Sequence, residues 1–235
     1  MLDWEMTMGE ADPKFDKYSE NYQDLVNNSL EFSGLTVDFF TQGKADFLDR
    51  LLDGKGDQTI LDVGCGIGDL HPFLAHVDRK ITGVDVSGES IKIAQETKPA
   101  NSYSIYDGRV LPFDKGTFDV VLTVCVMHHV PPAGWQDFIC EMVRVTKKGG
   151  MIAIFEHNPF NPLTRLAVNR CPFDADAVLL RAKQVEGMLL KTGQVTPQSD
   201  YIFFTPFKHP FFKKLDNLFS WLPLGAQYCT YGRKK

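Results

Sequence analysis

From Thr59 onward, short apolar runs alternate with segments whose apolar positions follow a helical period. In five runs nearly every position is β-branched or otherwise apolar, which is typical of strands buried on both faces of a parallel sheet. These runs are Thr59–Val63, Ile81–Val84, Ser102–Tyr106, Phe118–Val124 and Met151–Phe155. Strands that alternate with helices predict an α/β fold with right-handed crossover connections.

The segment before the fifth run has the clearest helical pattern. Its apolar residues recur at i, i+3, i+4, i+7 and i+8, and they are Trp135, Phe138, Ile139, Met142 and Val143. We expect this helix to end in the sequence from Lys147 to Gly150, because cations and glycine suit a helix C-terminus. Residues 15–52 also have a helical pattern, with a break near Ser33-Gly34.

Beyond Phe155 the alternation loosens. Two Asn-Pro pairs, at 158–159 and 161–162, predict turns. We expect a helix over Ala175–Leu190 and two final strands over Tyr201–Thr205 and Ala226–Tyr231. With 235 residues the chain has the size of one large α/β domain. We expect a single domain in three parts: a helical cover (1–57), a core (58–155) and acceptor-side elements (156–235).

Composition narrows the function classes. The formal net charge of −5 argues against a general nucleic-acid binder, which usually has a basic surface. The five cysteines are dispersed without C-x-x-C spacing, and His71 and His76 are five positions apart, so no metal site is predicted. Unpaired cysteines, no secretory h-region and no apolar run of about 18 residues lead us to expect a cytoplasmic protein without a membrane span.

The strongest chemical motif is a glycine-rich turn at residues 60–69, ILDVGCGIGD, where a strand runs into a helix. Glycines let the backbone approach a ligand closely, and the carboxyl end of a first parallel strand is where α/β sheets bind nucleotides. Asp85 follows the second strand, where a carboxylate can accept both ribose hydroxyls. Asp107 follows the third strand. The alternative is that both aspartates only cap local turns.

A nicotinamide dehydrogenase is the physical rival for this motif. Its fingerprint is G-x-G-x-x-G, in which the third glycine allows close packing of helix on strand. Here the glycines follow the spacing G-x-G-x-G, at Gly64, Gly66 and Gly68. A carboxylate beside the turn, such as Asp62 or Asp69, suits a cationic amino-acid group better than a pyrophosphate.

The chain resembles the class I, Rossmann-like S-adenosylmethionine methyltransferases, in particular the small-molecule group called type 11. The matching stretches are LDVGCGIGD (61–69), GVDVS (83–87), DGRVLPFDKGTFDVV (107–121), VCVMHHV (124–130) and MVRVTKKGGMIAI (142–154). They cover roughly Gln58–Phe155 in the family's order; beyond that the similarity is architectural. The resemblance implies a mainly parallel seven-stranded sheet with a closing antiparallel strand and S-adenosylmethionine as the cofactor.

The resemblance also assigns roles to matching positions. Asp62 and the glycines would surround the methionine part of the cofactor, Asp85 would bind the ribose, and Asp107 would accept from the adenine amino group. Two tyrosines of the N-terminal helix would close over the methionine end, or else simply pack in an amphipathic helix. The implied cofactor-binding set is Asp62, Gly64, Cys65, Gly66, Gly68, Asp85, Val86, Asp107, Gly108, Cys125, Val126, Tyr18 and Tyr22.

Methyl transfer from a sulfonium mainly requires alignment of nucleophile, methyl carbon and sulfur. A base is needed only when the acceptor must lose a proton, and a histidine can take one from a phenol or enol. His128 and His129 follow the fourth strand and are the candidate catalytic residues. Because adjacent residues project differently, we expect one of them to face the acceptor and the other to have a structural role. Glu156 and His157 reach the same sheet edge and serve either the acceptor or a polar turn.

The C-terminal segment is unusually aromatic. Ten aromatic residues lie within residues 201–231. They belong to the two expected strands and to the insertion Pro206–Pro223, in which we expect a short helix at Lys213–Ser220. The segment forms either core or an acceptor lid, and its lysines Lys208, Lys213 and Lys214 beside Phe211 and Phe212 also suit a membrane interface.

The sequence therefore predicts methyl transfer from S-adenosylmethionine to oxygen or carbon of a small, apolar or aromatic acceptor. One alternative is a methyltransferase for a lipid-linked or quinone-type acceptor, with peripheral membrane contact. The other is a non-catalytic regulatory protein that binds the cofactor.

Overall fold

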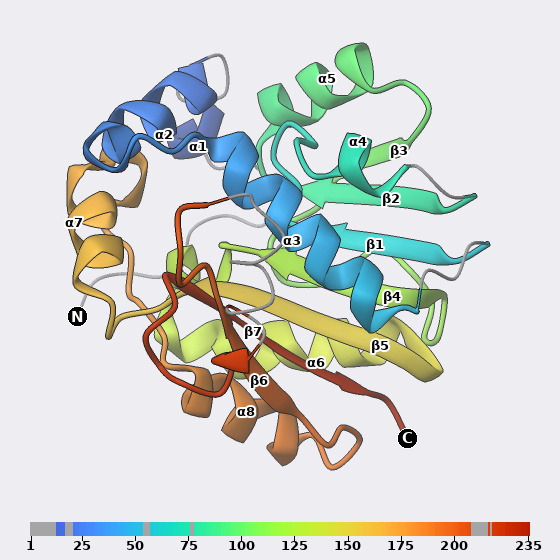
Figure 1. The fold of residues 1–235 in the computed structure, drawn as a ribbon. Helices are drawn as coiled ribbons and strands as arrows, with labels where there is room; N and C mark the ends of the chain where they lie inside the picture. Colours follow the sequence, from blue (N-terminus) through green and yellow to red (C-terminus); the bar gives the residue numbers. More distant parts are fainter. Residues whose placement is uncertain (1–12, 17–20, 54–56, 76–77, 208–215, 217) are drawn as a thin grey trace.

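The computed structural model describes residues 13–16, 21–53, 57–75, 78–207, 216 and 218–235. Its centre is a seven-stranded sheet with the order β3-β2-β1-β4-β5-β7-β6 (Figure 1). The strands are β1 (Thr59–Val63), β2 (Lys80–Asp85), β3 (Ser102–Ile105), β4 (Phe118–Val124), β5 (Thr146–His157), β6 (Gln198–Ile202) and β7 (Gln227–Arg233). Neighbouring strands are parallel except at β7, which is antiparallel to both β5 and β6. This confirms the predicted mainly parallel sheet with its antiparallel closing strand.

Helices cover both faces of the sheet (Figure 1). They are α1 (Pro13–Asp16), α2 (Tyr22–Leu30), α3 (Val37–Leu51), α4 (His71–Leu74), α5 (Gly88–Thr97), α6 (Trp135–Val145), α7 (Pro162–Arg170) and α8 (Ala182–Lys191). Along β5, Ile152 and Ile154 pack with α6 and α8, whereas Ala153 and Phe155 pack with α3. Burial on alternate faces explains why the strand sequences are apolar at nearly every position.

The N-terminal helices break where the sequence predicts. Gly34 adopts a left-handed conformation after the short 3-10 turn Glu31–Ser33, and α3 begins three residues later. α2 packs against α7, and together they lie beyond the carboxyl ends of the strands (Figure 1). No helix within the described part of the chain is long and apolar enough to cross a bilayer.

The end of α6 differs from the prediction. The helix ends at Val145, and the stretch from Lys147 to Gly150 belongs to β5. The cation that serves the helix C-terminus comes from the far end of the chain: Lys234 Nζ donates to the carbonyls of Val143 (2.6 Å) and Thr146 (2.8 Å). Lys147 instead pairs with Asp119 at 2.9 Å. The sequence predicted that nearby lysines would stabilise the C-terminus of α6, whereas Lys234, directly after β7, does so.

The two helices after β5 begin at residues that the pattern did not indicate. The Asn161 side chain accepts the backbone N–H groups of Leu163 and Thr164, so the second Asn-Pro pair starts α7 rather than forming a separate turn. The helix expected over Ala175–Leu190 is α8, which begins only at Ala182. Residues before it follow an irregular path, and there the Val178 N–H donates to the His128 carbonyl at 2.8 Å.

The edge strand β6 lies three residues earlier than expected at both ends: it covers Gln198–Ile202, not Tyr201–Thr205. Phe203 has a φ of 63°, which ends the extended conformation immediately after Ile202. The polar residue Ser199 bonds Thr230 across the pair at 2.8 Å, so cross-strand pairing outweighs the apolar pattern here. The expected lid residues Lys208, Phe211, Phe212, Lys213 and Lys214 lie outside the described residues.

We expect Lys234→Met to lower the free energy of unfolding by about 2–3 kcal/mol, because hydrogen bonds from a charged donor contribute about 1.5–3 kcal/mol each and the α6 carbonyls would be left unpaired. Urea denaturation measures the change. Lys235→Met is the matched control, since Lys235 is exposed. Equal stability of the two variants would contradict this role of Lys234.

Candidate active site

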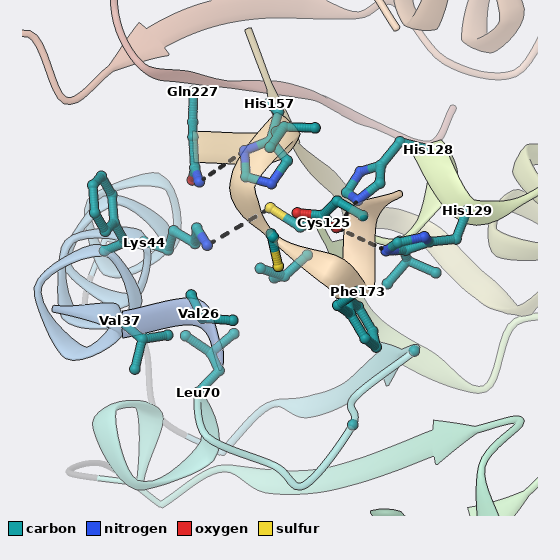
Figure 2. A pocket seen from close by; sticks show the side chains of 18 of the residues that line it. Val26, Val37, Lys44, Leu70, Cys125, His128, His129, His157, Phe173 and Gln227 are labelled. Carbon is teal, nitrogen blue, oxygen red and sulfur yellow. Dashed lines mark hydrogen bonds and ion pairs between the residues drawn. The ribbon is translucent and has the colours of Figure 1, made fainter. Parts of the chain in front are cut away.

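A cavity of about 1600 Å³ lies at the carboxyl ends of the parallel strands, and residues of α2, α3 and α7 line it. Figure 2 shows part of its lining, with Val26 of α2 and Lys44 of α3. In α/β sheets, ligands bind at this edge, at the point where strand order reverses. Here the reversal lies between β1 and β4. The glycine turn, the residues after β4 and the residues after β5 all line this one cavity.

The glycine turn is shaped for close approach of a ligand. Gly64 has a φ of 76°, and a Cβ there would lie 2.4 Å from Val126, so only glycine fits beneath this side chain. Gly66 has a φ of 53°, and a Cβ there would meet no atom within 4 Å, so this backbone faces open cavity. The Cys65 thiol turns away toward β2, where a Cβ at Gly83 would lie 2.6 Å from its sulfur. The backbone of the turn, rather than the thiol, therefore offers the binding surface.

Asp85 ties this turn to β2. Its Oδ2 accepts the N–H of Gly66 at 2.8 Å and its Oδ1 accepts the N–H of Ser87 at 2.9 Å. Burial raises the pKa of the Asp85 carboxyl, and the N–H donors of Ser87 and Gly66 oppose that shift. The carboxylate thus holds the turn in place and lines the cavity as well.

Two further carboxylates carry unpaired oxygens beside the turn. Asp62 Oδ2 lies 3.1 Å from His71 Nε2, whereas its Oδ1 is buried without a hydrogen-bond partner among the described residues. Asp69 Oδ2 is likewise buried and unpaired within the described structure. Buried polar atoms are normally satisfied, so both oxygens indicate a place for a donor from a ligand.

The side wall of the cavity comes from the ends of β2 and β3. Val86 and Gly108 face each other closely, since a Cβ at Gly108 would lie 3.2 Å from Val86. Asp107 Oδ1 accepts the N–H groups of Arg109 and Val110 at 2.8 Å. Desolvation would raise the pKa of Asp107, but these N–H donors outweigh it and hold the pKa below its ordinary value. The aspartate therefore does cap its own turn, and it lines the cavity too.

Of the two tyrosines expected over the site, one is described. Tyr22 starts α2, lines the cavity and meets Phe173 edge to face, with ring centroids 5.4 Å apart. Burial raises the pKa of its hydroxyl well above the ordinary value. Tyr18 lies outside the described residues.

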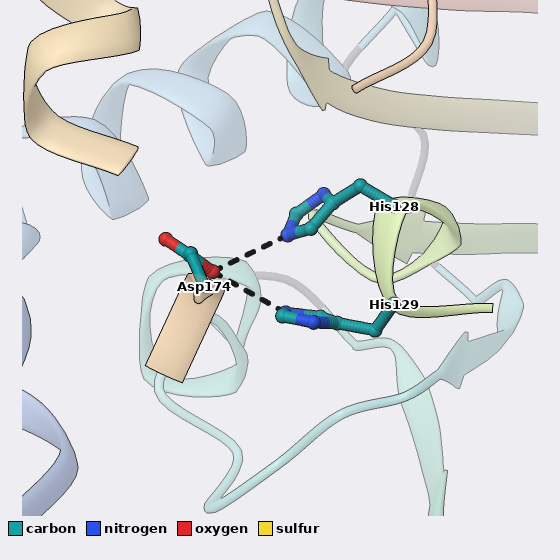
Figure 3. Close-up of side chains that lie close together, drawn as sticks. All are labelled: His128, His129 and Asp174. Carbon is teal, nitrogen blue, oxygen red and sulfur yellow. Dashed lines mark ion pairs between the residues drawn. The ribbon is translucent and has the colours of Figure 1, made fainter. Parts of the chain in front are cut away.

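Both candidate histidines face the same carboxylate (Figure 3). His128 Nε2 lies 3.5 Å and His129 Nε2 lies 3.4 Å from Asp174 Oδ1. Adjacent side chains were expected to project differently, but the 3-10 turn Met127–His129 brings both rings to one side, tilted at 51° with centroids 4.2 Å apart. Which of them faces the acceptor stays a prediction. Both line the cavity.

Glu156 holds the other side of His128. Its Oε2 lies 2.6 Å from His128 Nδ1, and its Oε1 accepts the N–H groups of Val126 and Met127. Burial alone would lower the pKa of His128, but the carboxylates of Glu156 and Asp174 raise it to about 10. Burial lowers the pKa of His129, and the charge of His128 adds to this against the opposing pull of Asp174. At neutral pH His128 is therefore cationic and His129 is neutral.

Sequence reasoning missed several polar residues of the cavity, among them Asp174 and Lys44. Asp174 follows Cys171-Pro172 on a short 3-10 turn, and nothing local distinguishes it. The sequence does contain a signal for Lys44, because this lysine lies between Thr41 and Leu48 on the buried side of α3. A cation is unexpected on the buried face of an amphipathic helix. The Nζ atom of Lys44 lies 3.8 Å from the sulfur of Cys125 (Figure 2). Cys125 has a φ of 56°, a strained conformation of the kind found at functional sites.

Residues 61–154 match the family model described as a methyltransferase domain, of the type 11 group. The chain is also similar to 2-methyl-6-phytyl-1,4-hydroquinone methyltransferase of Synechocystis sp., with 31% identity over 179 residues that cover 67% of this chain and 56% of that protein. The chain belongs to the class I S-adenosylmethionine-dependent methyltransferases.

Other similar proteins are named for different acceptors. Ajmaline N-methyltransferase of Rauvolfia serpentina is 36% identical over 110 residues, covering 44% of this chain and 37% of that protein. A solved SAM-dependent methyltransferase of Thermotoga maritima, titled a possible histamine N-methyltransferase, superposes with a TM-score of 0.67 at 19% identity, covering 95% of this chain and 99% of that one. That structure shows the fold alone. The chain spans about half or less of the length of the two relatives matched by sequence.

The methyltransferase fold takes S-adenosylmethionine as its cofactor, and the cavity suits it. The unpaired oxygens of Asp62 and Asp69 match a cationic amino group, and the open backbone at Gly66 leaves room for the chain that joins it to the sulfur. Asp85 lies where the ribose hydroxyls are expected, and Val86, Asp107 and Gly108 form the wall expected for adenine. These assignments remain predictions of individual contacts.

For this chain we expect micromolar binding of S-adenosylmethionine and of its demethylated product. Asp85→Ala should weaken that binding about 10- to 100-fold, because one hydrogen bond to a charged group contributes about 1.5–3 kcal/mol. Isothermal titration calorimetry measures it. Asp78→Ala, an exposed carboxylate before β2, is the matched control. Binding of NAD in place of S-adenosylmethionine would contradict the assignment.

Proposed function

We propose that this protein transfers the methyl group of S-adenosylmethionine to oxygen or carbon of a small, apolar or aromatic acceptor. The observation that carries the proposal is a single cavity that joins the glycine turn to an apolar chamber with a histidine–carboxylate cluster in its wall. Its volume of about 1600 Å³ exceeds the roughly 300–1,000 Å³ typical of pockets for one small molecule. The cavity therefore has room for a cofactor and an acceptor together.

The chamber beyond the glycine turn is apolar. Its lining side chains come from α2, α3, α7 and the turns near them, and they include Val26, Leu30, Leu35, Val37, Phe40, Ala167, Val168, Phe173 and Phe203. Such a wall favours an acceptor with a ring or hydrocarbon body, since burial of apolar surface contributes about 25 cal/mol per Å². The few polar groups, among them Lys44 and Gln227, would orient the acceptor's own polar atoms.

Methyl transfer itself needs little acid–base chemistry, because the sulfonium already activates the leaving group. The protein's main contribution would be to hold acceptor and cofactor in line. Where the acceptor must lose a proton, the cluster of His128, His129 and Asp174 is the group placed to assist. Burial lowers the pKa of His129, so it is the neutral member of the histidine pair.

We expect His129→Ala to lower kcat by about 100-fold or more for an acceptor that loses a proton, in the range of general acid–base contributions. Cofactor affinity should be unchanged, whereas Asp85→Ala should show the reverse pattern, and turnover of radiolabelled cofactor with calorimetry separates the two. If His128→Ala and His129→Ala both turn over normally, the histidines are structural. If the wild-type chain binds cofactor but methylates nothing in a broad acceptor panel, the regulatory alternative gains support.

A lipid-linked or quinone-type acceptor is the second candidate, favoured by an apolar patch at the cavity rim. We call Phe160, Leu163 and Leu224 the rim patch; their exposed fractions are 55%, 59% and 62%. The segments that carry these residues are held together, because the side chain of Asn161, between Phe160 and Leu163, donates to the Leu224 carbonyl at 2.8 Å. Leu163 also lines the cavity. The guanidinium of Arg181 lies 5.5 Å from the Phe160 ring, which adds a cation suited to anionic headgroups.

We expect the wild-type chain to float with anionic phosphatidylglycerol vesicles, and the double variant Phe160→Ser/Leu224→Ser to lose most of that flotation, because an interfacial contact depends on buried apolar area. Leu190→Ser is the matched control, as Leu190 is equally exposed (55%) but lies on α8. Absence of wild-type flotation on anionic and neutral vesicles alike would leave only a soluble acceptor.

A further inference from the structure

Three possible metal ligands converge on one point of the cavity wall. The Nε2 atoms of His128 and His129 lie 3.5 and 3.4 Å from Asp174 Oδ1, and all three ligand atoms lie within 4.8 Å of one another (Figure 3). These distances exceed ordinary N–H···O hydrogen bonds. They match two ligands bound to one ion at about 2.0–2.2 Å each, which lie about 3–3.5 Å apart in tetrahedral or octahedral geometry.

The surroundings of the two histidine rings also fit the binding of one ion between the rings and Asp174. Glu156 Oε2, 2.6 Å from His128 Nδ1, orients the ring so that Nε2 points toward Asp174. A histidine that binds a metal through one nitrogen commonly donates the other N–H to a carboxylate in this way. His129 has an 8% exposed side chain, and neither of its ring nitrogens has a hydrogen-bond partner among the described residues. Buried polar atoms normally have a hydrogen-bond partner. The Nε2 atom of His129 points toward the Asp174 carboxylate, so an ion bound between them would satisfy it.

We propose that His128, His129 and Asp174 bind one divalent transition-metal ion, with Glu156 as the carboxylate that orients His128. Binding of the ion would displace the proton that His128 carries in its absence, because only a neutral imidazole binds a metal. Two neutral imidazoles and two carboxylates, one of them outside the ligand set, then balance the charge of a divalent cation. Two imidazoles and one carboxylate suit zinc, iron(II), cobalt(II) or nickel(II) better than magnesium or calcium, which prefer oxygen ligands. The spacing of the histidines predicted no such site, because Asp174 comes from a distant segment that the fold brings to them.

This site deepens the proposed function and rests on it for its role. Three protein ligands leave positions open on the ion, as in catalytic metal sites, and the ligands line the chamber assigned to the acceptor. An acceptor hydroxyl bound there would have a lowered pKa and lose its proton to solvent. An oxygen lone pair would then form the new bond to the methyl carbon, and the electrons of the broken carbon–sulfur bond would return to sulfur.

The test uses the untagged full chain, stripped with a chelator and titrated with cobalt(II) alone. Visible absorption and calorimetry should show one ion per chain. We expect His129→Ala and Asp174→Asn each to weaken binding at least 100-fold, and Glu156→Gln to weaken it about 10- to 100-fold, as losses of outer carboxylates do. His157→Asn is the matched control, because this ring lies 5.1 Å from that of His128 but supplies no ligand, and it should keep wild-type affinity.

Cofactor calorimetry checks that the fold and the glycine turn remain intact in His129→Ala, Asp174→Asn and His157→Asn. Absence of one-to-one binding by the wild-type chain, or binding that His129→Ala and Asp174→Asn leave unchanged, would overturn the metal site. Neither result would touch methyl transfer, which the stripped chain could still perform. Conversely, one-to-one binding that these variants abolish supports the site even if no acceptor in the panel is methylated, a result that counts against the proposed function alone.

Discussion

The arrangement of the cavity depends on the hydrogen bonds of one buried carboxylate, that of Glu156 at the end of β5. A carboxylate fully removed from water is costly unless its oxygens are paired. One oxygen accepts two backbone N–H groups of the turn after β4, and the other bonds His128. Burial would raise the pKa of Glu156, but His128 and the N–H donors outweigh it, so the group stays ionised.

The hydrogen bonds between Glu156 and the turn after β4 affect the cavity on the cofactor side and on the acceptor side of that turn. Val126, whose N–H Glu156 accepts, packs directly over Gly64 and so shapes the glycine turn of the cofactor side. Two residues later, His128 and His129 are turned toward Asp174 on the acceptor side. A single charged group on the neighbouring strand therefore couples the two halves of the cavity, and its position follows directly from the parallel register of β4 and β5.

The residues that line the cavity fall partly inside and partly outside the region that the family model matches. The region that matches the family model, 61–154, supplies the glycine turn, Asp85, Asp107 and both histidines. Asp174, Lys44 and the apolar wall from α2, α3 and α7 all lie outside that region. Because the related methyltransferases differ in their named acceptors, we infer that these flanking segments determine what this chain accepts, while the shared core determines the methyl donor.

The sequence by itself determined the parallel core of the sheet and placed the glycine turn, Asp85 and Asp107 at its carboxyl edge. Those features rest on local information: apolar runs that need burial on both faces, and glycines and aspartates at fixed offsets from strand ends. The seven-strand count and the antiparallel closing strand came from the family resemblance. The tertiary structure alone decided the rest. Lys234 caps α6 in place of the nearby lysines, because β7 runs beside β5 and brings the chain's end to the helix. Asp174 lies beside His128 and His129, which are distant in sequence. The local pattern of apolar and polar residues does not predict this contact. Sequence patterns report which face of an element is buried, whereas contacts between distant side chains arise only when the elements pack.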